Sequence, residues 1–167
     1  MFTHSDYCTH IKNPEDKDIL TRRLFDVNIR LLKTSLSYRH IIQVCCDEIA
    51  WAARAEKKGY KKPHGWSGAN AGVPFNIIAV MREGRAVVMI NPKITKEYGE
   101  EIKTLSNCGS LTLEKPIPVI RKEFIDLEYY TIECEKIVET KVDRYSGSFT
   151  ILHEINHNLG ILITDPV

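Results

Sequence analysis

The feature that most constrains this chain is the run ILHEINHNLG close to its end. His153 and His157 are four residues apart, so on a helix both side chains lie on one face and can bind a single metal ion. Glu154 then lies beside the ion as a candidate acid/base. The run is apolar around these residues and contains neither Gly nor Pro before Gly160. The sequence therefore predicts a buried helix over 147–162 that presents a metal site to the rest of the fold.

The third ligand of such a site is not obvious from the motif alone. A catalytic zinc-type site commonly has three protein ligands and one open position. After His157 the usual spacings fail, because position 163 is Ile163 and the one later carboxylate is Asp165. The ligand must therefore come from upstream, where the candidates are Cys108, Cys134, His40 and His64. Cys108 is favoured by its small, polar surroundings, LSNCGSLTL, whereas Cys134 alternates within a predicted strand and could equally point into the core.

A long helix and a Gly-rich loop are predicted in the first half of the chain. From Ser37 to near Gly59, apolar residues recur at helical spacing and form one stripe: Ile41, Cys45, Ile49 and Ala52 or Ala53. The adjacent Cys45 and Cys46 are expected to pack in the core, and His40 to lie on the exposed face. The Gly- and Pro-rich loop 61–74 follows, and the earlier segment 20–32 is compatible with a short helix or an extended arm.

Strands are predicted in the middle of the chain. Two β-rich runs, 75–81 and 86–94, flank the turn REGR, and a further strand pair is predicted over 127–143. Strands in the middle and helices at the ends indicate the α+β class, with antiparallel sheets packed around the C-terminal HExxH helix and an N-terminal helix. At 167 residues the chain is expected to be one domain, 1–167.

Composition narrows the class of partner. The 23 Lys and Arg residues balance 22 Asp and Glu residues, which gives no electrostatic footprint for nucleic acid or an anionic membrane. Apolar runs such as NIIAVM are too short to span a bilayer, and the polar start MFTHSDYCTHIKNPEDKD resembles neither a signal nor a transit peptide. The five cysteines show no CxxC spacing. We therefore expect a cytoplasmic, monomeric protein with reduced thiols.

Three short motifs stand in order along the chain: PHGWSGAN, SNCGS and HEINH. Together they resemble the motifs of the peptide deformylase family, which run GxGxAAxQ, EGCLS and HExDH. The third is HEINH, with Asn156 in place of Asp, and the second is SNCGS, which keeps Cys108. The first is PHGWSGAN, anchored by the following AGVPFNIIAV, which is similar to the family's IGVPxxIIVI. This alignment puts Asn70 at the family's Gln, and Ser67 and Gly68 at its paired alanines. The resemblance spans roughly residues 37–165.

The resemblance implies a set of site residues. Cys108, His153 and His157 are the expected ligands of one divalent metal, Fe²⁺ in the cell, with Zn²⁺, Ni²⁺ or Co²⁺ able to occupy the same ligands. Glu154 is the expected proton shuttle. The expected oxyanion donors are the side chain of Asn70 and the backbone N–H of Gly109.

The resemblance also implies the reaction and its substrate. The family removes the N-formyl group from the formylmethionine of nascent polypeptides, and it pairs the peptide with its first motif as an added strand. His64 and Gly65 occupy those motif positions, and Phe149, one turn before His153, is expected to help wall the methionine pocket.

Other interpretations remain at this stage. The chain could be a small HExxH metallopeptidase, or a catalytically impaired deformylase-like protein that binds formyl-peptides or ribosomes. Asn70 could be a turn residue only. The Lys-rich segment AEKKGYKKPH is compatible with a solvated helix end or with contact to ribosomal RNA near the peptide exit.

Overall fold

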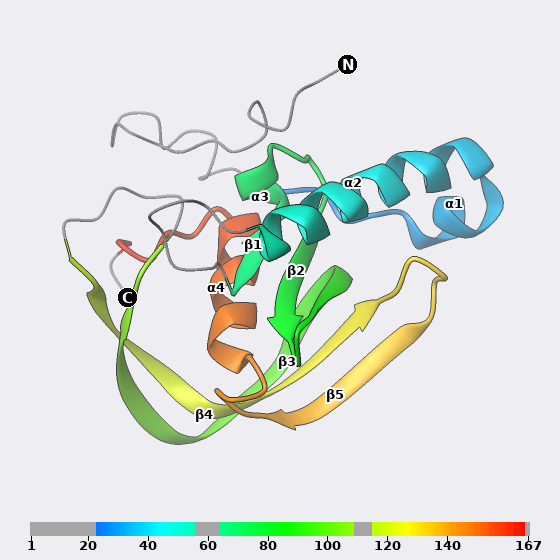
Figure 1. The fold of residues 1–167 in the computed structure, drawn as a ribbon. Helices are drawn as coiled ribbons and strands as arrows, with labels where there is room; N and C mark the ends of the chain where they lie inside the picture. Colours follow the sequence, from blue (N-terminus) through cyan, green and yellow to red (C-terminus); the bar gives the residue numbers. More distant parts are fainter. Residues whose placement is uncertain (1–22, 56–63, 109–114, 166–167) are drawn as a thin grey trace.

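A five-stranded antiparallel sheet forms the centre of the fold, and its strands follow one another in chain order. This is a computed structural model, which describes residues 23–55, 64–108 and 115–165. The strands are β1 (Gly65–Ser67), β2 (Ile77–Arg82), β3 (Arg85–Ser106), β4 (Ile117–Tyr130) and β5 (Lys136–Val142). The helices are α1 (Ile29–Thr34), α2 (Leu36–Arg54), α3 (Gly68–Ala71) and α4 (Ser148–Asn158). The predicted α+β class with an antiparallel sheet is confirmed (Figure 1).

Strand β2 is apolar from Ile77 to Met81 because a helix covers each of its faces. Ile77 and Ala79 pack in a cluster with α2, whereas Ile78 and Val80 pack in a second cluster with α4. Burial on both faces explains why NIIAVM is a continuous apolar run rather than an alternating one. The two clusters place the sheet between α2 and α4.

The turn between β2 and β3 has the residues that its geometry requires. Arg82 pairs with Arg85, and the two residues between them, Glu83 and Gly84, have φ of 48° and 77°. Positive φ at both central positions is the arrangement that suits the right-handed twist of a two-residue hairpin. The predicted strands on either side of REGR are confirmed.

The buried stripe of α2 is displaced from the predicted one in its first half. Ile41 is 52% exposed and Cys45 is half-buried, whereas the residues that face the core are Ile42, Cys46, Ile49, Ala50, Ala52 and Ala53. The predicted stripe is wrong in the first half of the helix. The face that carries Ile41 also carries the charged Glu48 two turns later, whereas the face that carries Ile42 and Cys46 is apolar along the helix. The predicted core packing of Cys46 and the exposure of His40 are confirmed.

Helix α2 also ends earlier than predicted. Its C-cap is Ala55, whose φ of −65° and ψ of 132° are extended, so the helix ends at Arg54 and not near Gly59. The core-facing stripe stops at Ala53, and the sequence that follows, AEKK, has no apolar residue beyond Ala55 with which to continue it. The remaining part of the Lys-rich segment, 56–63, lies outside the described residues.

The segment before α2 combines both alternatives left open by its sequence. The backbone around Phe25 is extended and forms a parallel bridge with Phe75, and α1 begins after the cap Asn28, whose side chain accepts from the N–H of Leu31. Ser35 then ends α1 and caps α2. An extended arm therefore leads into a short helix.

The long β3–β4 ribbon was only partly predicted. β3 runs twelve residues beyond the predicted end at 94, to Ser106, and β4 begins ten residues before the predicted start at 127, at Ile117. The missed parts, such as KEYGEEIK and RKEFID, are charged on both faces and lack the alternation of a half-buried strand. Register shifts between the two strands accompany the bend with which the ribbon curls around α4 (Figure 1).

Helix α4 lies on the concave side of this curved sheet. Its residues Ile151, Leu152 and Ile155 pack against the sheet, in a cluster that includes Met89 and Leu127. The predicted helix over 147–162 is confirmed, although it ends at Asn158. Within 23–55, 64–108 and 115–165, no helix has the length and apolar character needed to cross a membrane.

Candidate metal centre

Helix α4 positions the HEINH residues by its packing on the sheet. Its apolar face is buried against β2 and β4, which turns the adjacent face, with His153 and His157, toward the end of β3. His157 is 1% exposed and Glu154 is 6% exposed. His153, Glu154 and His157 therefore lie at the edge of the apolar core, where charge and hydrogen bonding have large effects.

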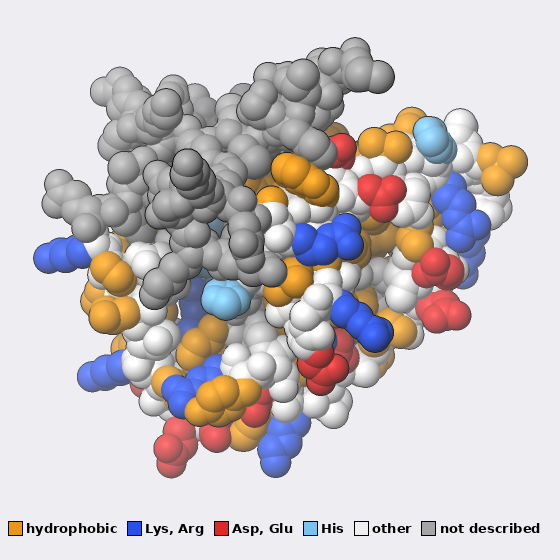
Figure 2. Space-filling model, viewed as in Figure 1, with side chains coloured by type: hydrophobic (Ala, Val, Ile, Leu, Met, Phe, Trp, Pro, Cys, Tyr) orange, Lys and Arg blue, Asp and Glu red, His pale blue; other side chains and the backbone are white. Residues whose placement is uncertain are grey.

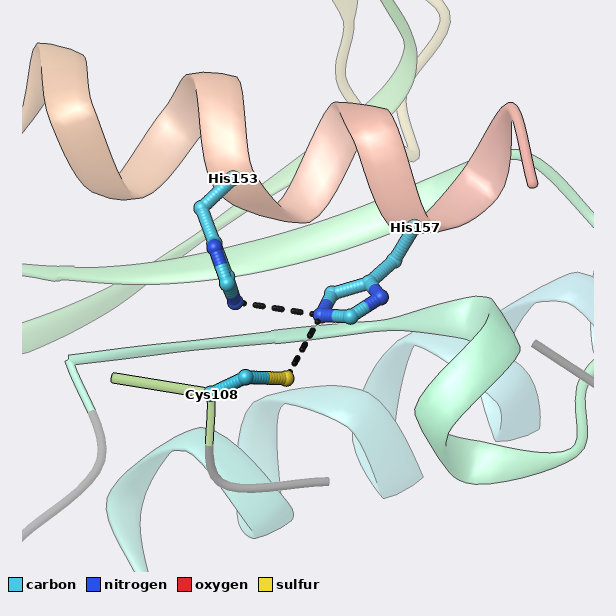
Figure 3. A group of neighbouring side chains, drawn as sticks. All are labelled: Cys108, His153 and His157. Carbon is cyan, nitrogen blue, oxygen red and sulfur yellow. Dashed lines mark hydrogen bonds between the residues drawn. The ribbon is translucent and has the colours of Figure 1, made fainter. Parts of the chain in front are cut away.

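Cys108 completes a cluster with the two histidines. It is 5% exposed and lies two residues after the end of β3. Its Sγ is 3.3 Å from Nε2 of His157, which is 3.1 Å from Nε2 of His153 (Figure 3). The three ligand atoms all lie within 4.8 Å of one another. The β3–β4 ribbon, distant in sequence from α4, thus delivers the thiol to the HEINH helix.

The donor set fits a transition-metal ion. A tetrahedral ion with metal–ligand distances of about 2.0–2.3 Å holds its ligand atoms about 3.3–3.7 Å apart. The separations of 3.1 and 3.3 Å between donor atoms are close to this spacing. One thiol with two imidazoles suits zinc or iron rather than magnesium or calcium, which prefer oxygen ligands. The cluster could therefore hold a metal ion.

Burial keeps both imidazoles neutral, which is the form that binds a metal. Burial lowers the pKa of His157 to about 4. Burial, with the charges of His157 and Arg121, lowers the pKa of His153 to about 3. For Glu154, burial raises the pKa of the carboxyl to about 8. A carboxyl group with a pKa in this range can both accept and deliver a proton near neutral pH.

Glycine at position 65 allows β1 to approach the glutamate of the motif. A Cβ on Gly65 would lie 2.6 Å from Cγ2 of Thr150 and 3.0 Å from Cγ of Glu154. Because real Cβ atoms do not come this close, only glycine permits this spacing between β1 and α4. The backbone of β1 is thus placed directly beside the Glu154 side chain.

Asn70 lies in α3, immediately after β1, and is 3% exposed. Its backbone N–H donates to Oγ of Ser67 at 3.3 Å, and the Ser67 hydroxyl donates to its Oδ1. Ser67 is fully buried and caps α3. The backbone of Asn70 therefore forms part of this turn, and its side chain is held by the hydroxyl of Ser67.

The other sequence candidates for the third ligand lie elsewhere. Cys134 lies in the turn after β4, with φ of 66°, so its predicted place within a strand is wrong. Its side chain packs in the core cluster with α2, which was the alternative to metal binding. His40 and His64 are exposed and do not join the metal cluster. Phe149 is half-buried in the first turn of α4. Gly109 lies outside the described residues.

One residue of the site region was not singled out from sequence. Asn158, directly after His157, is 1% exposed and donates to the carbonyl of Ile77 at 3.0 Å and to Oδ1 of Asn76 at 3.1 Å. Its own Oδ1 accepts from the N–H of Ala69 in α3 at 3.2 Å. The available signal was an amide residue in the otherwise apolar end of the predicted helix. Asn158 ties α4, the helix of His153 and His157, to α3 and β2.

Comparison with known proteins identifies the family. A family model for polypeptide deformylase matches residues 55–167. The chain belongs to the polypeptide deformylase family. This is a family of enzymes, as the motif resemblance implied, and the matched range contains all three motifs. Among curated proteins no match is found.

Solved deformylase structures share the fold at low sequence identity. A class I type b peptide deformylase from Acinetobacter baumannii, solved with bound Met-Ala-Ser, has a TM-score of 0.71 and 20% identity, covering 90% of this chain and 92% of that one. The enzyme from Thermotoga maritima has a TM-score of 0.68 and 19% identity, with 92% and 93% coverage. A probable deformylase from Synechococcus phage S-SSM7 has a TM-score of 0.65 and 20% identity, with 93% and 97% coverage.

The described surface seen in Figure 2 carries both signs of charge. On the face in Figure 2, lysine, arginine, aspartate and glutamate side chains of the described residues are interspersed rather than gathered into one field. This agrees with the formal net charge of +1.

Proposed function

We propose that this protein removes the N-formyl group from formylmethionine at the start of nascent polypeptides. The observation that carries the proposal is the cluster of Cys108, His153 and His157 beside a buried Glu154, in a chain of the polypeptide deformylase family. A decayed member of the family would be expected to lose one or more of these four residues, and all four are present.

The cluster is assigned to one divalent cation, Fe²⁺ in the cell, with Zn²⁺, Ni²⁺ or Co²⁺ as alternatives in the purified protein. When bound, such a cation supplies Lewis acidity, which lowers the pKa of water into the neutral range. The residues of the chain set the conditions for this chemistry: the two neutral imidazoles offer ring-nitrogen lone pairs, and the buried thiol of Cys108 would bind as a thiolate after losing its proton.

Glu154 is assigned the proton transfers. Its carboxyl is buried beside the histidines, and one of its oxygens, Oε2, has no hydrogen-bond partner among the described residues. In the proposal Glu154 takes the proton of the attacking water and later delivers it to the leaving amine of methionine. The tight contact of β1 with Glu154 keeps the carboxyl in one position for both steps.

Asn70 and Gly109 are assigned the stabilisation of the oxyanion that develops on the formyl group. Asn70 is buried in α3, and α3 is tied to the helix of the histidines by the hydrogen bond between Ala69 and Asn158. Preorganised N–H donors in a dry site stabilise a developing negative charge strongly. Gly109 follows Cys108 directly, so its N–H is assigned from sequence alone.

The substrate backbone is assigned to β1. Among the described strands, β1 stands at the end of the sheet and pairs only with β2, so its second edge is the place for an added peptide strand. His64 and Gly65 begin this edge, and Phe149 is assigned to the methionine pocket. The A. baumannii enzyme was solved with the tripeptide Met-Ala-Ser bound, and this peptide is the product expected from deformylation of formyl-Met-Ala-Ser.

Turnover of formyl-Met-Ala-Ser separates this function from its alternatives. After loading with Fe²⁺ or Ni²⁺ under exclusion of oxygen, the protein should release formate and Met-Ala-Ser, and the matched variant Glu154→Gln should not. Cleavage of an internal peptide bond would instead indicate a metallopeptidase. Binding of the formyl peptide without turnover by the metal-loaded protein would indicate an impaired deformylase-like binder.

The cellular setting follows from this function. We place the protein in the cytoplasm, as a monomeric single domain acting on chains that emerge from the ribosome. Nucleic-acid contacts with sequence specificity and membrane association are not part of the proposal.

A further inference from the structure

Ser67 makes two hydrogen bonds with a single residue of the proposed site. It is fully buried at the N-cap of α3, where its hydroxyl accepts from the backbone N–H of Asn70 at 3.3 Å. The same hydroxyl donates to Oδ1 of the Asn70 side chain. The first bond is an ordinary helix cap, but the second is not needed to form the turn.

The second bond fixes which side of the Asn70 amide faces the turn. A side-chain amide presents an acceptor oxygen on one side and two N–H donors on the other. With Oδ1 turned toward Ser67, the Nδ2 donors are directed away from this residue. An oxyanion can be stabilised only by the donors, so the opposite orientation would place an oxygen against developing negative charge.

We propose that Ser67 is a positioning residue that holds the Asn70 amide with its oxygen toward the turn and its N–H donors directed away from it, which is the orientation that a developing oxyanion requires. This inference rests on the proposed function, and it explains how a short Asn can serve where the family resemblance has Gln. The side chain of Asn70 has one torsion fewer than Gln, and the hydroxyl of Ser67, at a position where the family has alanine, removes much of the remaining freedom.

The turn that carries this pair is itself fixed to the metal helix. Asn158 accepts from the N–H of Ala69 and donates to the carbonyl of Ile77, and both partners are backbone groups that leave its orientation unambiguous. Gly68 brings the turn against the following segment, since a Cβ there would lie 2.4 Å from the carbonyl oxygen of Phe75. Ser67 therefore orients Asn70 from a turn that hydrogen bonds of Asn158 link to the helix of His157.

The test compares four forms of the metal-loaded protein: wild type, Ser67→Ala, Asn70→Ala and the double variant. We expect Ser67→Ala to lower kcat for formyl-Met-Ala-Ser roughly tenfold, with KM and metal content nearly unchanged, because orientation acts on the transition state. The double variant should be no slower than Asn70→Ala alone, since the hydroxyl acts only through that amide.

A matched control separates positioning from loss of a buried hydroxyl. Ser148 is also fully buried, and its Oγ has no hydrogen-bond partner among the described residues. Ser148→Ala should therefore leave kcat unchanged. A crystal structure of the zinc-loaded Ser67→Ala protein supplies a readout independent of turnover: the side-chain torsions of Asn70 should differ from those of wild type.

The outcomes are distinct for this inference and for the proposed function. If Asn70→Ala lowers kcat but Ser67→Ala matches wild type, or if the Asn70 torsions are the same in both crystal structures, the positioning role of Ser67 is overturned and the deformylase function stands. If wild type does not turn over the formyl peptide, the proposed function fails, while the two crystal structures still decide whether Ser67 orients Asn70.

Discussion

Gly65→Ala is predicted to disturb the site through a single added carbon atom. The new Cβ would lie 2.6 Å from Cγ2 of Thr150 and 3.0 and 3.1 Å from Cγ and Oε1 of Glu154. Thr150 is β-branched and sits in the first turn of α4, where few χ1 rotamers are allowed, so it cannot easily rotate away. The strand and the helix must therefore separate, or Glu154 must change its rotamer.

The size of both effects can be worked from these contacts. Overpacking of a filled core costs about 1–3 kcal/mol, which for a chain of this size lowers Tm by about 2–12 °C. A displaced Glu154 loses much of its proton-transfer role, worth on the order of a hundredfold in kcat. Thermal melting at equal metal loading and turnover of formyl-Met-Ala-Ser measure the two effects separately.

A second substitution makes this prediction specific. In Gly65→Ala/Thr150→Ser the methyl group at 2.6 Å is gone, but the contacts with Glu154 remain. Most of the lost Tm should return, whereas kcat should stay low. If Gly65→Ala melts and turns over like wild type, β1 does not hold Glu154 in place and the reasoning from the close contact is refuted.

Three further predictions concern single side chains of the site. Glu154→Gln should keep its metal but lose on the order of a hundredfold or more in kcat, and a near-normal rate would exclude the proton-shuttle role. Asn70→Ala should lower kcat by roughly a hundredfold with metal content unchanged, and Asn70→Gln should be no better than wild type, because the turn is shaped for the shorter side chain. Asn158→Leu should lower the free energy of unfolding in urea by about 2–6 kcal/mol. The N–H of Ala69 and the carbonyl of Ile77 would each lose their hydrogen bond to Asn158, at a cost of about 1–3 kcal/mol per group. A loss below about 1 kcal/mol would mean that these groups find other partners.

Much of this site could be predicted because its signals are local. The four-residue spacing of His153 and His157 in an apolar run defined the helix and its polar face, and the REGR turn defined the first hairpin. The motif order then linked Cys108 to the histidines, although spacing alone had left four candidates for the third ligand. Local periodicity was sufficient wherever one face of an element is buried by neighbours close in sequence.

The unpredicted parts depend on contacts between distant segments. The far part of the β3–β4 ribbon has charged residues on both faces, so its strands are recognisable only from their pairing, Lys103 with Ile120 for instance. On α2, two neighbouring apolar stripes compete, and the choice depends on which of them the sheet covers. The bonds of Asn158 join positions more than 80 residues apart, which no short-range pattern reveals.

The most direct test of the proposed metal centre is the metal content of purified wild type measured beside Cys108→Ala, with Cys134→Ala as the control for loss of a buried thiol. Cys108 lies with the two histidines, whereas Cys134 packs in the α2 core. Because the thiolate is one of the three proposed protein ligands, we expect about one metal ion per chain in wild type and Cys134→Ala, and almost none in Cys108→Ala. Retention of a full equivalent of metal by Cys108→Ala would contradict the assignment of this cluster as the metal centre.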